Sequence, residues 1–188
     1  MEIKKLIALV LAALMVLGCT AAFAEEVQAL ELNWEDFAQQ IEEASEEVKA
    51  AWAGDFVTME EIAMKIYVPT AFEQLELIDV DREEGYIAYF LLEEDCAVAV
   101  QYMDMDGMTL EEYAQLLTGE LGIEECHDAV VNGLPALFYS FTEEEAETSV
   151  LAFATERGYI LEVSFSPTND EGFAAVATVM MGSIQAAE

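Results

Sequence analysis

The apolar residues between positions 33 and 54 recur at steps of three and four, which is the spacing of one helix face. Asn33 is a favourable N-cap and Gly54 a favourable stop, so the pattern predicts a helix over residues 34–52. Such a stripe usually docks on its own domain, although a partner-binding arm is the alternative. We therefore expect residues 25–54 to form an amphipathic helix packed on the rest of the chain. The stripe consists of Trp34, Phe37, Ile41, Ala44, Val48 and Trp52.

After Gly54 the apolar period shortens to two, which is typical of half-buried strands. The runs of this kind are residues 56–57, 62–68, 86–92 and 97–103. Pro69 closes the second run. The acidic residues 93–95 separate the last two runs, which predicts a hairpin. Between the second and third runs, residues 72–77 favour a short turn of helix.

The clearest helix start lies in the middle of the chain. Thr109 and Glu112 have the spacing of a capping box, in which each side chain bonds a free backbone amide of the first turn. Apolar residues then form one face as far as Leu121, and Gly122 supplies a left-handed stop. We expect a helix over residues 110–121.

Four strands and a last helix follow. The dipeptide Asn132-Gly133 predicts a type I′ hairpin turn, because both residues tolerate positive φ angles. Pro135 indicates an edge strand or a position without a ladder hydrogen bond. Residues 149–155 and 159–166 predict a second hairpin. The last helix is expected to start near Asn169-Asp170 and to present Phe173, Val176, Met180 and Ile184 on one side.

Adjacent hairpins favour antiparallel pairing, and amphipathic helices need an apolar sheet to cover. The pattern therefore predicts one α+β domain over residues 55–188. Its sheet is expected to be mostly antiparallel, with about six or seven strands flanked by helices.

The first 24 residues have the order of a secretory signal peptide. Lys4 and Lys5 precede an apolar run over residues 6–17, and Ala22-Phe23-Ala24 forms an A-x-A cleavage site. We expect cleavage after Ala24, a secreted or cell-surface protein, and no membrane insertion afterwards, since the run is short for a bilayer span. Lipidation of Cys19, in the lipobox-like residues 16–19, is the alternative processing route.

The chain is strongly acidic, with 6 Lys and Arg residues against 39 Asp and Glu residues and a net charge of −33. Loss of the leader would bring the net charge to −34. Such a charge repels phosphate backbones and anionic lipid surfaces, so it argues against nucleic acid and membranes as partners. The apolar content of 55% argues against disorder. The remaining partner classes are a protein, a peptide or an envelope component.

Three segments resemble the PsbP-like α/β/α domains of exported bacterial proteins. They are the strand end IYVP (residues 66–69), the helix opening DGMTLEEY (residues 106–113) and the hairpin VNGLPA (residues 131–136). The resemblance spans roughly residues 62–184 and implies a PsbP-like sandwich fold. It also implies an accessory or binding role without catalysis. The leader and the acidity resemble those of secreted proteins from anaerobic Gram-positive bacteria.

His127 is the one histidine of the chain, and Cys126 precedes it. A cysteine nucleophile needs a base within hydrogen-bond reach, but neighbours on a strand point to opposite faces. Paired C-x-x-C or H-x-x-x-H spacing for zinc is also missing from the sequence. We therefore interpret His127 as a strand residue without a catalytic role.

Cys96 and Cys126 would be the two cysteines left after cleavage. In an extracytoplasmic compartment they are candidates for a disulfide bond. A pair of free thiols is equally compatible with the sequence, so the disulfide and the two free thiols both remain open.

Two pairs of acidic residues are candidate calcium ligands. Asp79 and Asp81 begin a run of alternating oxygen ligands, but Gly85 falls one place late for an EF-hand and Phe90 replaces the bidentate glutamate. Asp104 and Asp106 form a second incomplete candidate. Solvated acidic loops explain both pairs equally well.

Glycine loops for nucleotides and the G-x-S-x-G elbow of hydrolases are missing from the sequence, and no cofactor is expected. The sequence is interpreted as a non-catalytic extracytoplasmic binding or accessory module. An acidic protein that binds divalent cations such as calcium is the alternative.

Overall fold

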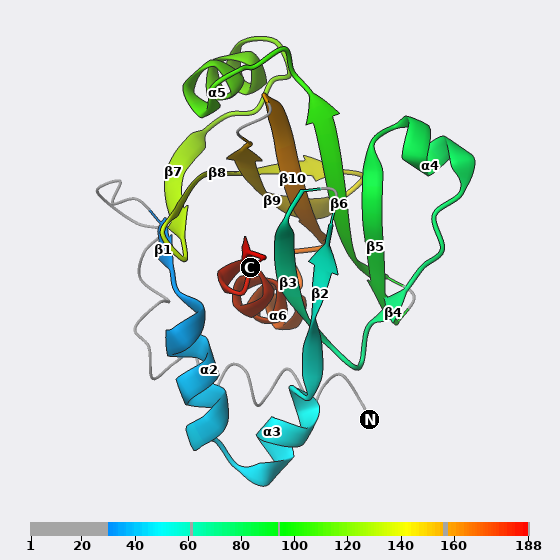
Figure 1. The fold of residues 1–188 in the computed structure, drawn as a ribbon, viewed down its shortest axis with the longest axis vertical. Helices are drawn as coiled ribbons and strands as arrows, with labels where there is room; N and C mark the ends of the chain where they lie inside the picture. Colours follow the sequence, from blue (N-terminus) through cyan, green and yellow to red (C-terminus); the bar gives the residue numbers. More distant parts are fainter. Residues whose placement is uncertain (1–29, 61, 94, 156–157, 188) are drawn as a thin grey trace.

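The computed structural model describes residues 30–60, 62–93, 95–155 and 158–187. The leader, its cleavage site at Ala24 and Cys19 lie outside the described residues. The chain forms an α+β fold with two sheets and helices packed around them (Figure 1). Among the described residues, no helix is both long and apolar enough to cross a bilayer.

The larger sheet has eight strands. Their order is β1 (Leu30–Leu32), β7 (Cys126–Val131), β8 (Leu134–Glu143), β9 (Ala146–Ala154), β10 (Tyr159–Ser166), β6 (Cys96–Asp104), β5 (Tyr86–Leu92) and β4 (Glu73–Gln74). All neighbouring pairs are antiparallel except β1 with β7. The predicted mostly antiparallel sheet flanked by helices is therefore confirmed, and β1 adds an N-terminal strand that the sequence did not indicate.

The smaller sheet has three strands in the order β11 (Gln185–Ala186), β3 (Met64–Pro69) and β2 (Gly54–Met59). It was not predicted as a separate sheet. Helix α6 (Glu171–Gly182) begins at the expected place, where the side chain of Asp170 accepts a hydrogen bond of 2.8 Å from the Phe173 amide.

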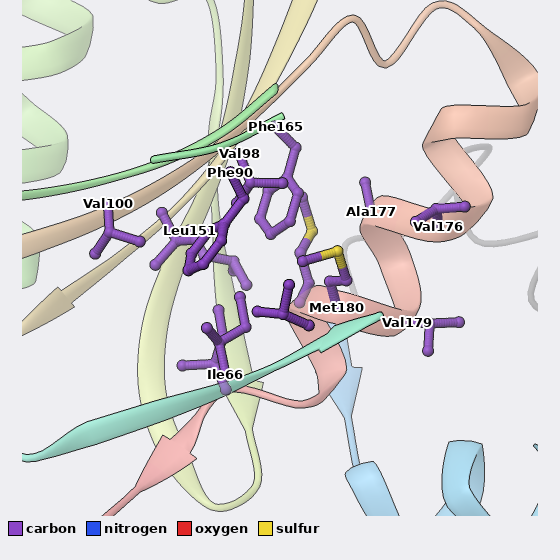
Figure 2. Close-up of a cluster of buried hydrophobic side chains, with 14 of the residues drawn as sticks. Ile66, Phe90, Val98, Val100, Leu151, Phe165, Val176, Ala177, Val179 and Met180 are labelled. Atoms are coloured by element: carbon purple, nitrogen blue, oxygen red, sulfur yellow. The ribbon is translucent and has the colours of Figure 1, made fainter. Parts of the chain in front are cut away.

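The main core lies between the large sheet, helix α6 and the small sheet. Figure 2 shows side chains from all three parts meeting there, with Phe90 and Phe165 of the large sheet, Met180 of α6 and Ile66 of β3. We call the sheet face in this core the inner face. Its side chains are almost fully buried because α6 and β3 exclude water from them.

The N-terminal helix predicted over residues 34–52 is two helices, α2 (Trp34–Glu43) and α3 (Glu46–Ala51). Ser45 separates them because its hydroxyl group accepts a hydrogen bond of 3.4 Å from the Val48 amide and so caps a new helix. The apolar stripe stays in phase across this break, which is why periodicity alone did not detect it.

Helix α2 is tied to the domain at its first residue, Trp34. The Asn132 side chain accepts a hydrogen bond of 2.7 Å from the Trp34 amide and donates bonds of 2.8 and 2.7 Å to the carbonyls of Gly182 and Ile184. Asn132 also starts the predicted hairpin turn, with φ angles of 49° at Asn132 and 79° at Gly133. One turn residue therefore joins β7, α2 and the end of α6.

Helix α5 (Leu110–Gly119) starts with the predicted capping box of Thr109 and Glu112. It packs on β7, β8 and β9 from the outer face of the sheet, which is the face opposite α6. The helix ends at Gly119, earlier than expected, and Leu121 is 63% exposed.

One local prediction is wrong. Residues 72–77 contain the short strand β4 in place of a turn of helix, and the helix of this region is α4 (Asp79–Glu83). Of the two alternatives for Pro135, β8 is not an edge strand, but Pro135 does occupy a position without a ladder hydrogen bond, since it follows the closing pair of the two-residue turn and lies before the register with β9 begins. Pro135 is exposed, so its ring faces solvent beside Val130.

Candidate functional site

The two faces of the large sheet differ in how well they are covered. Along β5, β6 and β10, buried residues alternate with half-buried ones. The buried set faces α6, as the core contains Val98, Val100 and Val163. The half-buried set faces the other way, where helix α5 covers β7, β8 and β9 and reaches Ile160 at the start of β10.

The uncovered part of the outer face is called the open face here. Its strand register brings Tyr89 beside Ala99, and Ala99 beside Ser164, so the face is continuous from β5 to β10. Small and hydroxyl-bearing side chains make it shallow. The open face consists of Tyr89, Leu91, Ala97, Ala99, Gln101, Thr148, Ser164 and Ser166, all half-buried.

The open face carries no positive charge. The cationic residues among those described are Lys49 on α3, Lys65 on β3 and Arg82 on α4. None of them belongs to the outer face. The surface is therefore apolar and hydroxyl-rich within a very acidic protein, and electrostatics favours a neutral or cationic occupant.

A half-buried carboxylate lies where the open face meets helix α5. The hydroxyl group of Tyr113 donates a hydrogen bond of 2.7 Å to Oε1 of Glu162, and the Tyr139 hydroxyl donates to the same oxygen. These three residues, here called the Glu162 cluster, come from α5, β8 and β10. Both tyrosine side chains are 4% exposed, so the cluster is largely shielded from water.

The second oxygen of Glu162 is free. No hydrogen bond to Oε2 from any described residue is found, and no buried side-chain oxygen of the described part lacks a partner. Oε2 is therefore accessible to solvent. Gln101 lies opposite Glu162 on β6. Its Nε2 donates a hydrogen bond of 2.8 Å to the Glu84 carbonyl, so its amide oxygen remains available as an acceptor.

Burial sets the electrostatics of this cluster. Desolvation raises the pKa of Glu162, while the hydrogen bonds from Tyr139 and Tyr113 oppose that rise. Desolvation and the Glu162 charge raise the pKa of Tyr113 and of Tyr139 as well. Among the described residues, the ion pairs are Lys49–Glu46 and His127–Glu125, so Glu162 has no cationic partner there.

Glu162 was not predicted as a site residue from the sequence. Its place in the strand YILEVSFS could have indicated it, because it is the one charged residue there among apolar and hydroxyl side chains. A charge in the middle of a central strand is costly unless it is bonded, so it usually has a structural or functional reason.

The disulfide candidate is not formed. Cys96 and Cys126 are free thiols on β6 and β7, and β8, β9 and β10 lie between these strands. Cys96 packs against the main core on the inner face. Cys126 packs against the residues beneath α5 on the outer face, so the two cysteines lie on opposite faces of the sheet. Burial and the nearby carboxylates of Asp170, Asp95 and Glu93 raise the pKa of Cys96 to about 11, which keeps it protonated near neutral pH.

His127 does not pair with either cysteine in the described structure. It lies on β7 beside Phe138, on the inner-face side, whereas Cys126 lies beside Tyr139 on the outer face. Nε2 of His127 is 3.5 Å from the Glu125 carboxylate. No nucleophile and base are thus brought together at this position.

The four aspartates considered as calcium ligands are not gathered into a metal site in the described structure, and two of them accept local hydrogen bonds. Asp81 accepts a hydrogen bond of 2.8 Å from the Ile78 amide and caps α4, the helix that also carries Asp79. Asp104 accepts a bond of 3.1 Å from the Asp106 amide. Within the described ranges, no group of three or more His, Cys, Asp or Glu residues is arranged to hold a metal ion.

A hollow of about 350 Å³ lies between β4, α4 and β5. It is open to solvent, and Arg82 is the one cationic residue in its wall. The Arg82 guanidinium is 3.4 Å from the Leu77 carbonyl, so it braces the loop that forms the rim. The lining residues are Gln74, Leu75, Glu76, Leu77, Arg82, Ile87 and Ala88.

Comparison with known proteins identifies the fold and gives no activity. No protein-family model matches the chain, and no curated protein matches its sequence. The structure is similar to cyanobacterial PsbP (CyanoP) from Synechocystis, with a TM-score of 0.52, 11% identity, and 72% of this chain and 93% of that chain covered. The fold is therefore PsbP-like.

Two further similarities are weaker. A crystal structure from Bacteroides thetaiotaomicron matches with a TM-score of 0.49 and 13% identity, over 72% of this chain and 49% of that one. LpqN of Mycobacterium tuberculosis, described as involved in cell envelope biogenesis, matches with a TM-score of 0.44 and 13% identity, over 72% of this chain and 91% of that one.

Proposed function

We propose that this protein is a non-catalytic extracytoplasmic binding module that holds a polypeptide partner on its open face. The observation that supports this most is the asymmetry of the large sheet. One face is sealed by α6 and the small sheet, while the described residues leave the part of the other face over β5, β6 and most of β10 uncovered. A contiguous, shallow and partly apolar surface of this kind is typical of an interaction site.

The extracytoplasmic location rests on the first 24 residues. Lys4, Lys5, the apolar run and the site ending at Ala24 support export by a cleaved signal peptide, with lipidation at Cys19 as the other route. The acidity and the leader together support an origin among the secreted proteins of anaerobic Gram-positive bacteria.

A binding role fits the chemistry better than catalysis does. Cys96 is protonated near neutral pH, and neither cysteine meets His127 in the described structure. The Glu162 cluster has one carboxylate and two tyrosines whose raised pKa values make them poor proton donors and acceptors near pH 7. We assign the cluster to recognition.

The test is a selection of peptides on the exported domain, residues 25–188, from a random 12-residue library displayed on phage. Ala99→Trp fills the open face at a half-buried position of β6, and tryptophan has a favourable strand propensity. Synthetic versions of the enriched peptides should bind this variant at least tenfold more weakly than the wild type. The matched control Ala50→Trp, on an exposed position of α3, should bind them unchanged. Equal affinity of both variants would refute the proposal.

A further inference from the structure

The Glu162 cluster leaves a half-buried, partly desolvated negative charge without a counter-charge among the described residues. Desolvated carboxylates are normally paired, because desolvation of an isolated charge is costly. The two tyrosine hydroxyls satisfy Oε1 and leave Oε2 free. The site therefore has an acceptor oxygen, reduced solvent screening and no cation among the described residues.

We propose that Glu162 receives the ammonium or guanidinium group of a lysine or arginine from a basic polypeptide bound on the open face. This inference rests on the proposed function and adds the charge of the partner and the residue that anchors it. Oε2 of Glu162 and the amide oxygen of Gln101 are the two acceptors for the incoming N–H groups. An N–H group bonded to a carboxylate makes one of the stronger hydrogen bonds in proteins.

The occupant is a basic polypeptide for two reasons. The open face extends from Glu162 across Ser164 and Ala99 to Tyr89, so it accommodates an extended or helical segment beside the anchored side chain. The net charge of −33 attracts basic chains and repels nucleic acid and anionic lipid. A metal ion fits poorly, since Glu162 is the one carboxylate of the cluster and no group of three or more His, Cys, Asp or Glu residues is found among the described residues.

Binding through Glu162 has a recognisable pH dependence. The cation pairs with the ionised carboxylate, so affinity falls as the pH falls through the raised pKa of Glu162. The other titratable groups facing the cluster are Tyr113 of α5, Tyr139 of β8, Tyr86 of β5 and Cys126 of β7. The pKa of each tyrosine is raised above 10.0 and that of the Cys126 thiol above 9.0, so all four stay neutral in this range. Loss of binding in acid then reports Glu162.

Two synthetic peptides test the inference on residues 25–188. One is a capped heptapeptide of alternating lysine and valine, and the other has glutamine in place of each lysine. Their dissociation constants are measured in about 0.15 M salt, where long-range attraction is screened. Glu162→Gln should weaken the lysine peptide tenfold or more, and should leave the glutamine peptide unchanged.

Glu42→Gln is the matched control, because Glu42 is an exposed carboxylate on α2 and its loss changes the net charge equally. It should weaken the lysine peptide less than twofold. Lowering the pH from 7.5 to 5 should weaken that peptide more on the wild type than on Glu162→Gln.

The failures of the two proposals are distinguishable. If Glu162→Gln and Glu42→Gln weaken binding equally, the attraction is diffuse and the anchor role of Glu162 is wrong. If Ala99→Trp abolishes binding of both peptides while Glu162→Gln changes neither, the open face binds polypeptides without that anchor. If neither Ala99→Trp nor Glu162→Gln changes binding, both proposals fail.

Discussion

The hydroxyl group of Tyr113 lies 2.7 Å from Oε1 of Glu162 and donates a hydrogen bond to it. This bond joins α5, which covers one end of the outer face, to β10 in the middle of the large sheet. Tyr139 donates to the same oxygen from β8. One carboxylate oxygen therefore connects three elements at the border between the covered and the open part of the sheet.

Removing the Tyr113 hydroxyl should destabilise the fold. Tyr113→Phe deletes a buried hydrogen bond to a carboxylate, so the free energy of unfolding should fall by about 1–3 kcal/mol in urea titrations. Tyr89→Phe is the control, because Tyr89 is half-buried on the open face and no hydrogen bond from its hydroxyl to a described residue is found. It should change stability by less than about 0.5 kcal/mol. Equal losses in both variants would contradict the role of the bond.

The stability effect of Glu162→Gln should depend on pH. Burial raises the folded-state pKa of Glu162, so the folded protein holds this proton more tightly than the unfolded chain does. The stability associated with the proton is complete below the unfolded-state pKa, about 4.3, and is lost as the pH rises through the folded-state value. Glutamine does not titrate, so the variant should gain stability relative to the wild type as the pH rises.

Thermal unfolding midpoints of both proteins between pH 4 and pH 8 check this expectation. The difference between the two midpoints should shift in favour of Glu162→Gln between pH 4 and pH 8. The repulsion among the remaining carboxylates affects both proteins alike and cancels in the difference. A constant difference across the range would show that Glu162 does not titrate with a raised pKa.

Gly182→Ala should be destabilising although alanine is normally the better helix former. A Cβ atom at Gly182 would collide with the ring of Phe37, which is the buried residue of α2. Overpacking of this kind costs about 1–3 kcal/mol, which exceeds the gain of about 1 kcal/mol from helix propensity. Gly119→Ala in α5, where nothing lies within 4 Å of the added atom, should not destabilise. Urea titrations give the change in the free energy of unfolding for each variant. A loss in Gly182→Ala without a loss in Gly119→Ala would show that α2 packs closely on α6.

Calcium should act on this protein only through ionic strength. Asp79, Asp81, Asp104 and Asp106 are not part of a group of metal-ligating residues in the described structure. Millimolar calcium and millimolar magnesium should therefore raise the unfolding midpoint equally at matched ionic strength. A selective rise with calcium, lost in Asp79→Asn or Asp104→Asn, would restore the alternative of a calcium-binding protein.

Elements with local signals were predictable from the sequence. The Thr109–Glu112 capping box and the Asn132-Gly133 turn act through neighbouring residues, so their sequence spacing defines their geometry. Strands β5 and β6 also follow the alternating pattern closely, since one side of each is fully buried and the other is not.

Elements that depend on distant partners were not predictable. Strand β1 exists because Leu30–Leu32 pair with Ala129–Val131, about a hundred residues away. The small sheet likewise needs β11, which forms only after α6 has returned the chain to β3. Glu162 looked like an ordinary acidic residue among 39, and only the fold brings Tyr113 and Tyr139 to it.

The central claim is that partners bind on the open face, and amide chemical shifts of isotopically labelled residues 25–188 test it most directly. On titration with an enriched library peptide, the largest shifts should map to Tyr89, Ala97, Ala99, Ser164 and their neighbours on β5, β6 and β10. The amides of α2, β2 and β3 should not move. Shifts confined to those three elements, with the open face unchanged, would contradict the account.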